Sequence, residues 1–190
     1  LSDQDYELIN MAPPQMITGL KTGALDVIAV WEPFPSIATV QVPGSTVVLH
    51  GAGPCTNCYD VPLFATSQGI IDEKRDLIKR FWIAHAEAMQ YARNHIDEAA
   101  EITQRWVEGV DLDSIKVSLS KDAASMDPRL SKAFTEGITT NSIPFLVELG
   151  RVETFDIAPF VNFDFQKAAV ASRPDLFSDL PPIDAKYTLN

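Results

Sequence analysis

The stretch that decides the fold is residues 7–38, which read ELINMAPPQMITGLKTGALDVIAVWEPFPSIA. An apolar segment at residues 6–11 predicts a strand, and the proline pair at 13–14 favours the start of a helix. Gly23 is a natural helix end. The nearly continuous apolar run 25–31 is typical of a strand buried on both faces of a parallel sheet. Together these segments predict a βαβ unit with a right-handed crossover.

The composition indicates a globular protein and argues against several functions. Of the 190 residues, 46% are hydrophobic and 22% are charged, which is typical of a chain with a packed core. Asp and Glu number 26 against 15 Lys and Arg, giving a net charge of -11. An acidic chain repels phosphate backbones, so we expect no nucleic-acid partner.

The rest of the chain is dominated by helical periodicity. Residues 72–95 place apolar side chains close to every 3.6 positions, and a second helix is expected over 96–107. A third helical stretch, 131–150, contains a proline that predicts a break or kink within it. Trp82 and Trp106 are expected to anchor the core of these helices. The fold class predicted is therefore α/β, with the strands in the amino-terminal part of the chain and helices after them.

The chain resembles a known family through residues 7–38. The proline-led helix, the Thr22-Gly23-Ala24-Leu25-Asp26 turn and the phrase Val30-Trp31-Glu32-Pro33-Phe34 are similar to the second lobe of nitrate/sulfonate/taurine-type binding proteins of ABC importers. That group also includes binders of thiamine precursors. The resemblance implies a two-lobe type II periplasmic binding fold.

The resemblance also implies a domain division. Residues 1–50 would be the remainder of lobe two, and residues 51–190 the carboxy-terminal part of lobe one plus a helical tail. Members of the family are longer at the amino end, so we expect the chain to begin inside a longer protein. Apolar surface and sheet edges left bare by a missing half-lobe would favour self-association or a partner chain.

The candidate ligand site begins at Trp31, Glu32 and Pro33. These residues follow a predicted strand, and in open α/β sheets ligands bind outside the carboxyl ends of strands. Trp31 could equally fill the core. For Glu32 the favoured alternative is a cap on the next helix, because a carboxylate facing an anionic ligand would repel it.

The loop 51–60, GAGPCTNCYD, supplies the other candidate ligand residues: Thr56, Asn57, Cys58 and Tyr59. Hydroxyl and amide donors of this kind could bind an oxyanion. Cys55 and Cys58 could instead form a strained disulfide or remain two small buried thiols. With two Cys and three His in the chain, a zinc site is not expected, and no other metal or cofactor is predicted.

The function predicted is that of a solute-binding receptor without enzymatic activity. It would deliver a small anionic or polar solute, such as nitrate, a sulfonate or taurine, to an ABC permease and its ATPase. The resemblance places such a protein in the periplasm or on the outer side of a membrane. No recognised catalytic motif is present. The alternatives are a protein that binds or makes the thiamine pyrimidine and a ligand-sensing domain of a regulator.

Overall fold

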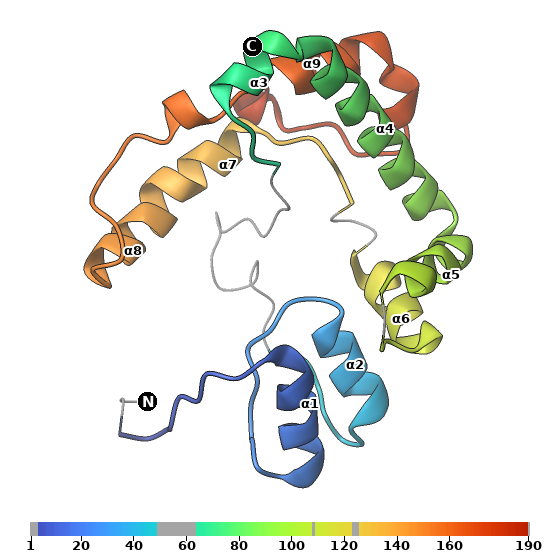
Figure 1. The fold of residues 1–190 in the computed structure, drawn as a ribbon, viewed down its shortest axis with the longest axis vertical. Helices are drawn as coiled ribbons and strands as arrows, with labels where there is room; N and C mark the ends of the chain where they lie inside the picture. Colours follow the sequence, from blue (N-terminus) through green and yellow to red (C-terminus); the bar gives the residue numbers. More distant parts are fainter. Residues whose placement is uncertain (1–3, 49–63, 108, 123–125, 190) are drawn as a thin grey trace. The chain divides into compact units, whose positions relative to one another are not determined.

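A computed structural model describes residues 4–48, 64–107, 109–122 and 126–189 (Figure 1). The chain divides into two compact units, and each is described by itself. The first unit combines residues 1–48 with 96–122, and the second combines 49–95 with 123–190. The predicted lobe boundary at residue 50 stays a prediction.

The first unit contains four helices in its described residues: α1 (Pro13–Thr22), α2 (Phe34–Gln41), α5 (Ile96–Trp106) and α6 (Leu112–Asp122). Helix α1 confirms the helix predicted after the proline pair. It ends at Gly23, whose φ of 72° is the left-handed conformation that glycine adopts without steric cost. Helix α2 contacts both α1 and α6.

The core of the first unit is small and lies where α1 and α2 meet. Its buried members are Ile17, Ile37 and Ala38. Partly buried apolar side chains surround them: Leu20, Ile28, Phe34, Val42 and Val110. This packing fixes the position and direction of the first turn of α2.

The second unit contains five α-helices in its described residues: α3 (Gln68–Glu73), α4 (Arg75–Asn94), α7 (Lys132–Gly137), α8 (Ile143–Glu148) and α9 (Asp164–Ser172). Helix α4 packs against α9. Its Trp82 and Ala86 join Leu176 and Phe177 in the core, and the rings of Trp82 and Phe177 lie 6.2 Å apart. Trp82 is therefore a core anchor, as predicted.

The interruption predicted within residues 131–150 is also present. A π-helical turn, Ile138–Ser142, separates α7 from α8, and Pro144 occupies the first turn of α8. Proline lacks an N–H group and its ring crowds the carbonyl four residues earlier. The predicted break therefore takes the form of a wider, π-helical turn directly before α8.

The α/β class is correct only in its helical part. Within the described residues no segment is assigned as a strand, so the predictions of strands at 6–11 and 25–31 differ from the structure. A strand exists through hydrogen bonds to a neighbouring strand, and these two segments find none in the described part of the chain. Several of their apolar side chains are open to solvent, such as Leu8 at 89% and Val27 at 73% exposure, although Ile28 packs against the core of the first unit.

Trp106 corrects a second prediction. Its side chain is 84% exposed at the end of α5, so it anchors no core within the described residues. Periodicity located its helix correctly, but the packing partner that would cover the apolar face was assumed. A helical pattern alone does not identify that partner.

Candidate functional site

The predicted residues Trp31, Glu32 and Pro33 lie directly before α2. We call them, together with Phe34 and Ser36 in the first turn of that helix, the α2 shoulder. Pro33 is the cap residue, and its bond to Glu32 is cis. The amide of Phe34 donates to the carbonyl of Trp31 at 3.1 Å, which folds the chain back at this point.

Trp31 presents its indole to solvent. The side chain is 64% exposed, and its ring meets the ring of Phe34 edge to face at a centroid distance of 6.2 Å. Phe34 in turn packs against the core of the first unit. Trp31 therefore does not fill the core within the described residues, and its role at a ligand site stays a prediction. The indole contacts a neighbour that is itself anchored.

Glu32 does not cap α2. No side chain makes a capping hydrogen bond at the start of this helix. Instead, one carboxylate oxygen, Oε2, is buried and has no hydrogen-bond partner in the described part of the chain. The alternative favoured from the sequence is therefore wrong, because the Glu32 carboxylate makes no hydrogen bond to the free amides of the helix.

Ser36 has the same property. Its side chain is fully buried, and its Oγ is the other buried side-chain oxygen without a hydrogen-bond partner among the described residues. Most buried polar atoms in folded proteins are hydrogen-bonded, and each exception needs an explanation. Two such atoms four residues apart in sequence mark the α2 shoulder as the unusual polar region of the first unit.

The far end of α2 is held by ordinary polar contacts. Gln41 accepts from the ammonium of Lys21 at 2.9 Å and donates to Asp111 at 2.8 Å. Asp111 also accepts from the amide and the hydroxyl of Ser114, at 2.9 and 2.8 Å. These bonds, first among them the one from the Ser114 amide, lower the pKa of Asp111. Asp111 thus satisfies a free amide at the start of α6, as a helix-capping residue does.

The loop residues Thr56, Asn57, Cys58 and Tyr59 lie outside the described residues. Their assignment to the ligand site stays a prediction, and so do the alternatives for the cysteine pair.

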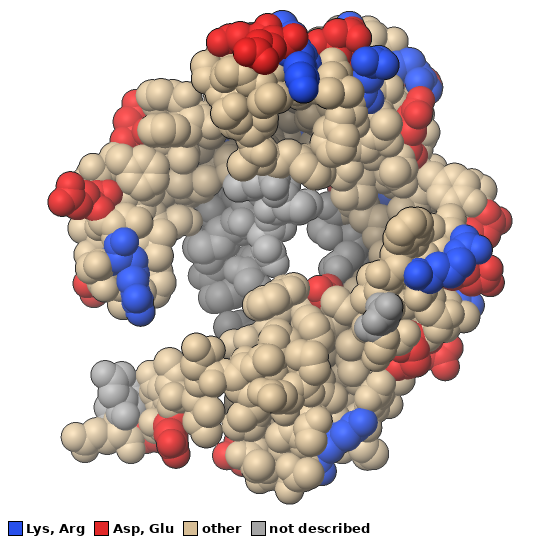
Figure 2. All heavy atoms as spheres, viewed as in Figure 1, with Lys and Arg blue, Asp and Glu red and all other residues tan. Residues whose placement is uncertain are grey.

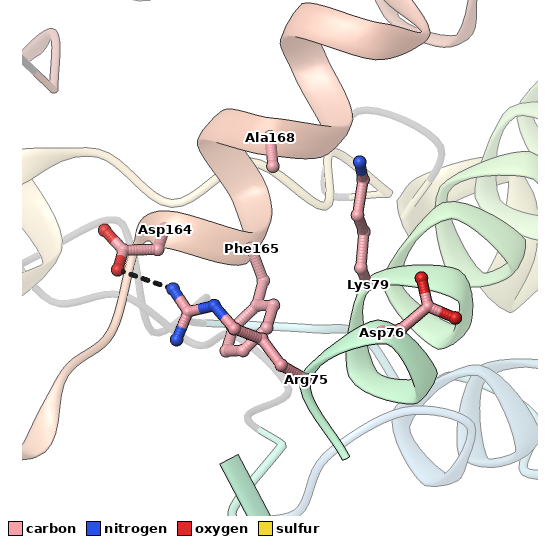
Figure 3. A pocket seen from close by; sticks show the side chains of 6 residues that line it. All are labelled: Arg75, Asp76, Lys79, Asp164, Phe165 and Ala168. Carbon is pink, nitrogen blue, oxygen red and sulfur yellow. Dashed lines mark hydrogen bonds and ion pairs between the residues drawn. The ribbon is translucent and has the colours of Figure 1, made fainter. Parts of the chain in front are cut away.

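The second unit has a shallow cavity of about 440 Å³ between the first turns of α4 and α9. Arg75 and Lys79 reach it from α4, and Asp164 and Phe165 from α9 (Figure 3). Arg75 pairs with Asp164 at 3.1 Å and lies over the Phe165 ring at 5.0 Å. Both partners of the ion pair are mostly exposed, so the cavity is open to solvent. The charge of Arg75 is already neutralised by Asp164, and surface pairs of this kind contribute little to stability.

Charge on the second unit is mixed. In the face drawn in Figure 2, Lys and Arg side chains lie beside Asp and Glu side chains where α3 and α4 are found. Asp76, next to the cavity, pairs with Arg80 at 3.0 Å. Local pairing of this kind indicates a solvated surface rather than an anion-binding one.

Sequence reasoning missed a buried arginine in the last turn of α4. Arg93 donates from Nε and Nη2 to both carboxylate oxygens of Asp179, at 2.8 and 3.0 Å. It also donates to the carbonyls of Met126, at 2.6 Å, and Leu176, at 3.2 Å. We call this group the Arg93 hub. Its partners lie 33 to 86 residues away, so no local pattern could have identified them.

Comparison with known proteins identifies the family. Residues 2–107 match the NMT1-like family, and because this is more than half of the chain, the protein belongs to it. The match contains α1, the α2 shoulder and α4. The resemblance to nitrate/sulfonate/taurine-type binding proteins is thereby confirmed.

A curated relative is similar over part of the chain. It is a putative aliphatic sulfonates-binding protein of Bacillus subtilis (strain 168), 26% identical over 98 residues. The aligned region covers 52% of this chain and 29% of the relative, so the chain spans less than a third of the protein it matches. No solved structure matches the chain.

The described residues contain no group of three or more His, Cys, Asp or Glu side chains placed to hold a metal ion. Within the same residues, no helix combines the length and the apolar character needed to cross a membrane.

Proposed function

We propose that the protein is an extracytoplasmic solute-binding receptor that delivers a small anionic or polar solute to an ABC importer. Nitrate, a sulfonate, taurine or a similar compact molecule is the solute class. The partners are a permease and its ATPase, and the receptor itself carries out no chemical reaction. The location is the periplasm or the outer side of a membrane.

The observation that carries the proposal is the family match over residues 2–107, which includes the α2 shoulder. The relative named for aliphatic sulfonates supports the solute class. The exposed indole of Trp31 adds a physical reason, since an aromatic side chain at the surface offers a large contact area to a bound molecule.

The mechanism proposed is binding between two lobes followed by closure about a hinge, with the closed form presented to the importer. In this proposal, residues 1–50 belong to lobe two and residues 51–190 to lobe one. Trp31, Glu32 and Pro33 would contribute one side of the site, and Thr56, Asn57, Cys58 and Tyr59 the other.

Thermal denaturation of the purified native protein tests the proposal. Nitrate, alkanesulfonates, taurine and an aminopyrimidine are added in turn. A solute at a hundred times its dissociation constant stabilises the native state by about 2.7 kcal/mol, so the cognate solute should raise the melting temperature clearly. Turnover of any of these compounds would contradict the receptor and favour an enzyme.

A further inference from the structure

We infer that Glu32 and Ser36 receive an amino group of the solute, so that the cognate ligand carries an N–H donor in addition to any anionic group. This inference rests on the proposed function and narrows its solute class. The observations behind it are the two buried oxygens of the α2 shoulder, Glu32 Oε2 and Ser36 Oγ, which lack partners in the described part of the chain.

Burial without a partner is what makes these atoms informative. An exposed carboxylate would be hydrated by water, but Glu32 Oε2 is shielded from solvent and has no hydrogen-bond partner in the described part of the chain. Ser36, in the first turn of α2, is fully buried. A protein pays for such unsatisfied groups in stability, and a binding site is one of the places where that cost is offset when the ligand arrives.

The chemistry of the two groups decides what they can bind. An ionised carboxylate only accepts hydrogen bonds, whereas a serine hydroxyl can accept and donate. A bare anion such as nitrate offers acceptors alone and would be repelled by Glu32. An ammonium or aromatic amine offers N–H donors that suit the carboxylate, and the hydroxyl can accept one as well.

Trp31 fits the same ligand. Its exposed indole adjoins Glu32 in sequence and is braced by Phe34. Cations are attracted to the face of an aromatic ring, tryptophan most of all. An ammonium held by the carboxylate could therefore also use the indole face, which a plain alkanesulfonate has no group to exploit.

Two ligands that differ only in the amino group test the inference. The affinities of 2-aminoethanesulfonate and ethanesulfonate are measured by isothermal titration calorimetry on the native protein. A charge-assisted hydrogen bond predicts that the amino compound binds at least about tenfold more tightly. An aminopyrimidine is titrated in parallel, because tight binding of that compound instead would identify an aromatic amine as the donor and support the inference.

Variants then assign the preference to residues. Glu32→Gln should reduce the affinity ratio of the preferred amino ligand to its amino-free counterpart to near one. The matched control is Glu7→Gln, which changes an exposed carboxylate in the same stretch and should leave the ratio unchanged. If Glu32→Gln does not fold, Ser36→Ala takes its place and should lower the ratio by about threefold.

Three results would overturn the inference. Equal affinity of the wild-type protein for ligands with and without the amino group would do so while leaving the receptor function intact. An unchanged ratio in a folded Glu32→Gln variant would do the same. Absence of binding by all the solutes, nitrate included, would overturn the proposed function and the inference together.

Discussion

The α2 shoulder and the Arg93 hub both bury polar groups, but they do so in opposite ways. In the hub, a guanidinium that is 7% exposed has four hydrogen bonds from three of its nitrogens. In the shoulder, a carboxylate oxygen and a hydroxyl are shielded from solvent and have no partner among the described residues.

If the shoulder binds the solute as inferred above, this difference separates polar groups that hold the fold together from polar groups available to a ligand. A buried charge with all its hydrogen bonds satisfied joins segments that are distant in sequence, here α4 with residues 126 and 176–179. Removing one partner leaves the remaining buried groups without a hydrogen bond, and each of them then costs its full desolvation free energy. An unsatisfied group already bears that cost, so removing it should not lower the free energy of unfolding, and its loss should affect binding instead.

The largest expected effect is on the hub. Arg93→Met should lower the free energy of unfolding by about 3 kcal/mol, because it leaves a partly buried carboxylate and two carbonyls without their donor. Urea denaturation measures the loss. Arg75→Met is the matched control, since the Arg75–Asp164 pair is 57% and 64% exposed, and such surface pairs contribute less than about 1 kcal/mol. Equal losses in the two variants would contradict the distinction.

The hub also predicts a dependence on pH. The hydrogen bonds from Arg93 are the first cause that lowers the pKa of Asp179 below its ordinary 3.8. A carboxyl with a lowered pKa in the folded state contributes stability that is fully present above the unfolded value and is lost as the pH falls through the folded one. The free energy of unfolding should therefore decrease below about pH 4.

The effect of acid should be smaller than that of Arg93→Met, because protonating Asp179 leaves the bonds from Arg93 to the two carbonyls in place. Urea midpoints measured between pH 5 and pH 2 give the slope. Asp111, whose pKa is also lowered, adds to it. The slope should be shallower in Arg93→Met than in the wild type, and identical slopes would show that Asp179 is not stabilised by the hub.

The smallest expected effect on stability comes from two serines that are equally buried, and it compares the shoulder directly with a satisfied site. Ser36 and Ser114 are both fully shielded from solvent, but only Ser114 has its hydroxyl bonded, to Asp111. Ser114→Ala should cost about 1 kcal/mol, and Ser36→Ala should be neutral to within about 0.5 kcal/mol. A substantial loss in Ser36→Ala would mean that its hydroxyl has a structural partner.

Local patterns predicted the helices well. The proline pair and Gly23 bound α1, and the 3.6-residue periodicity located α4 and α5, because these signals depend only on neighbours in sequence. The prediction of strands was wrong, because the apolar runs 6–11 and 25–31 become strands only when another strand lies beside them. Trp106 was misjudged for the same reason: its helix was visible in the sequence, but its covering partner was not.

The placement of Trp31, Glu32 and Pro33 before a helix was predicted from the sequence, and the structure has these residues directly before α2. Their role as ligand residues stays a prediction. That Glu32 buries one oxygen without a partner, instead of capping α2, depends on the folded surroundings of the α2 shoulder, which no local pattern describes. The Arg93 hub depends on contacts across as many as 86 residues, which no motif records.

The most direct test of the account is tryptophan fluorescence during ligand titration. If Trp31 contacts the solute, binding should change the emission of the native protein. Trp31→Phe should remove most of that change and weaken affinity by about threefold to tenfold. Trp106→Phe, which alters an indole that is even more exposed, should preserve both. An undiminished signal and affinity in Trp31→Phe would show that the solute binds away from the α2 shoulder.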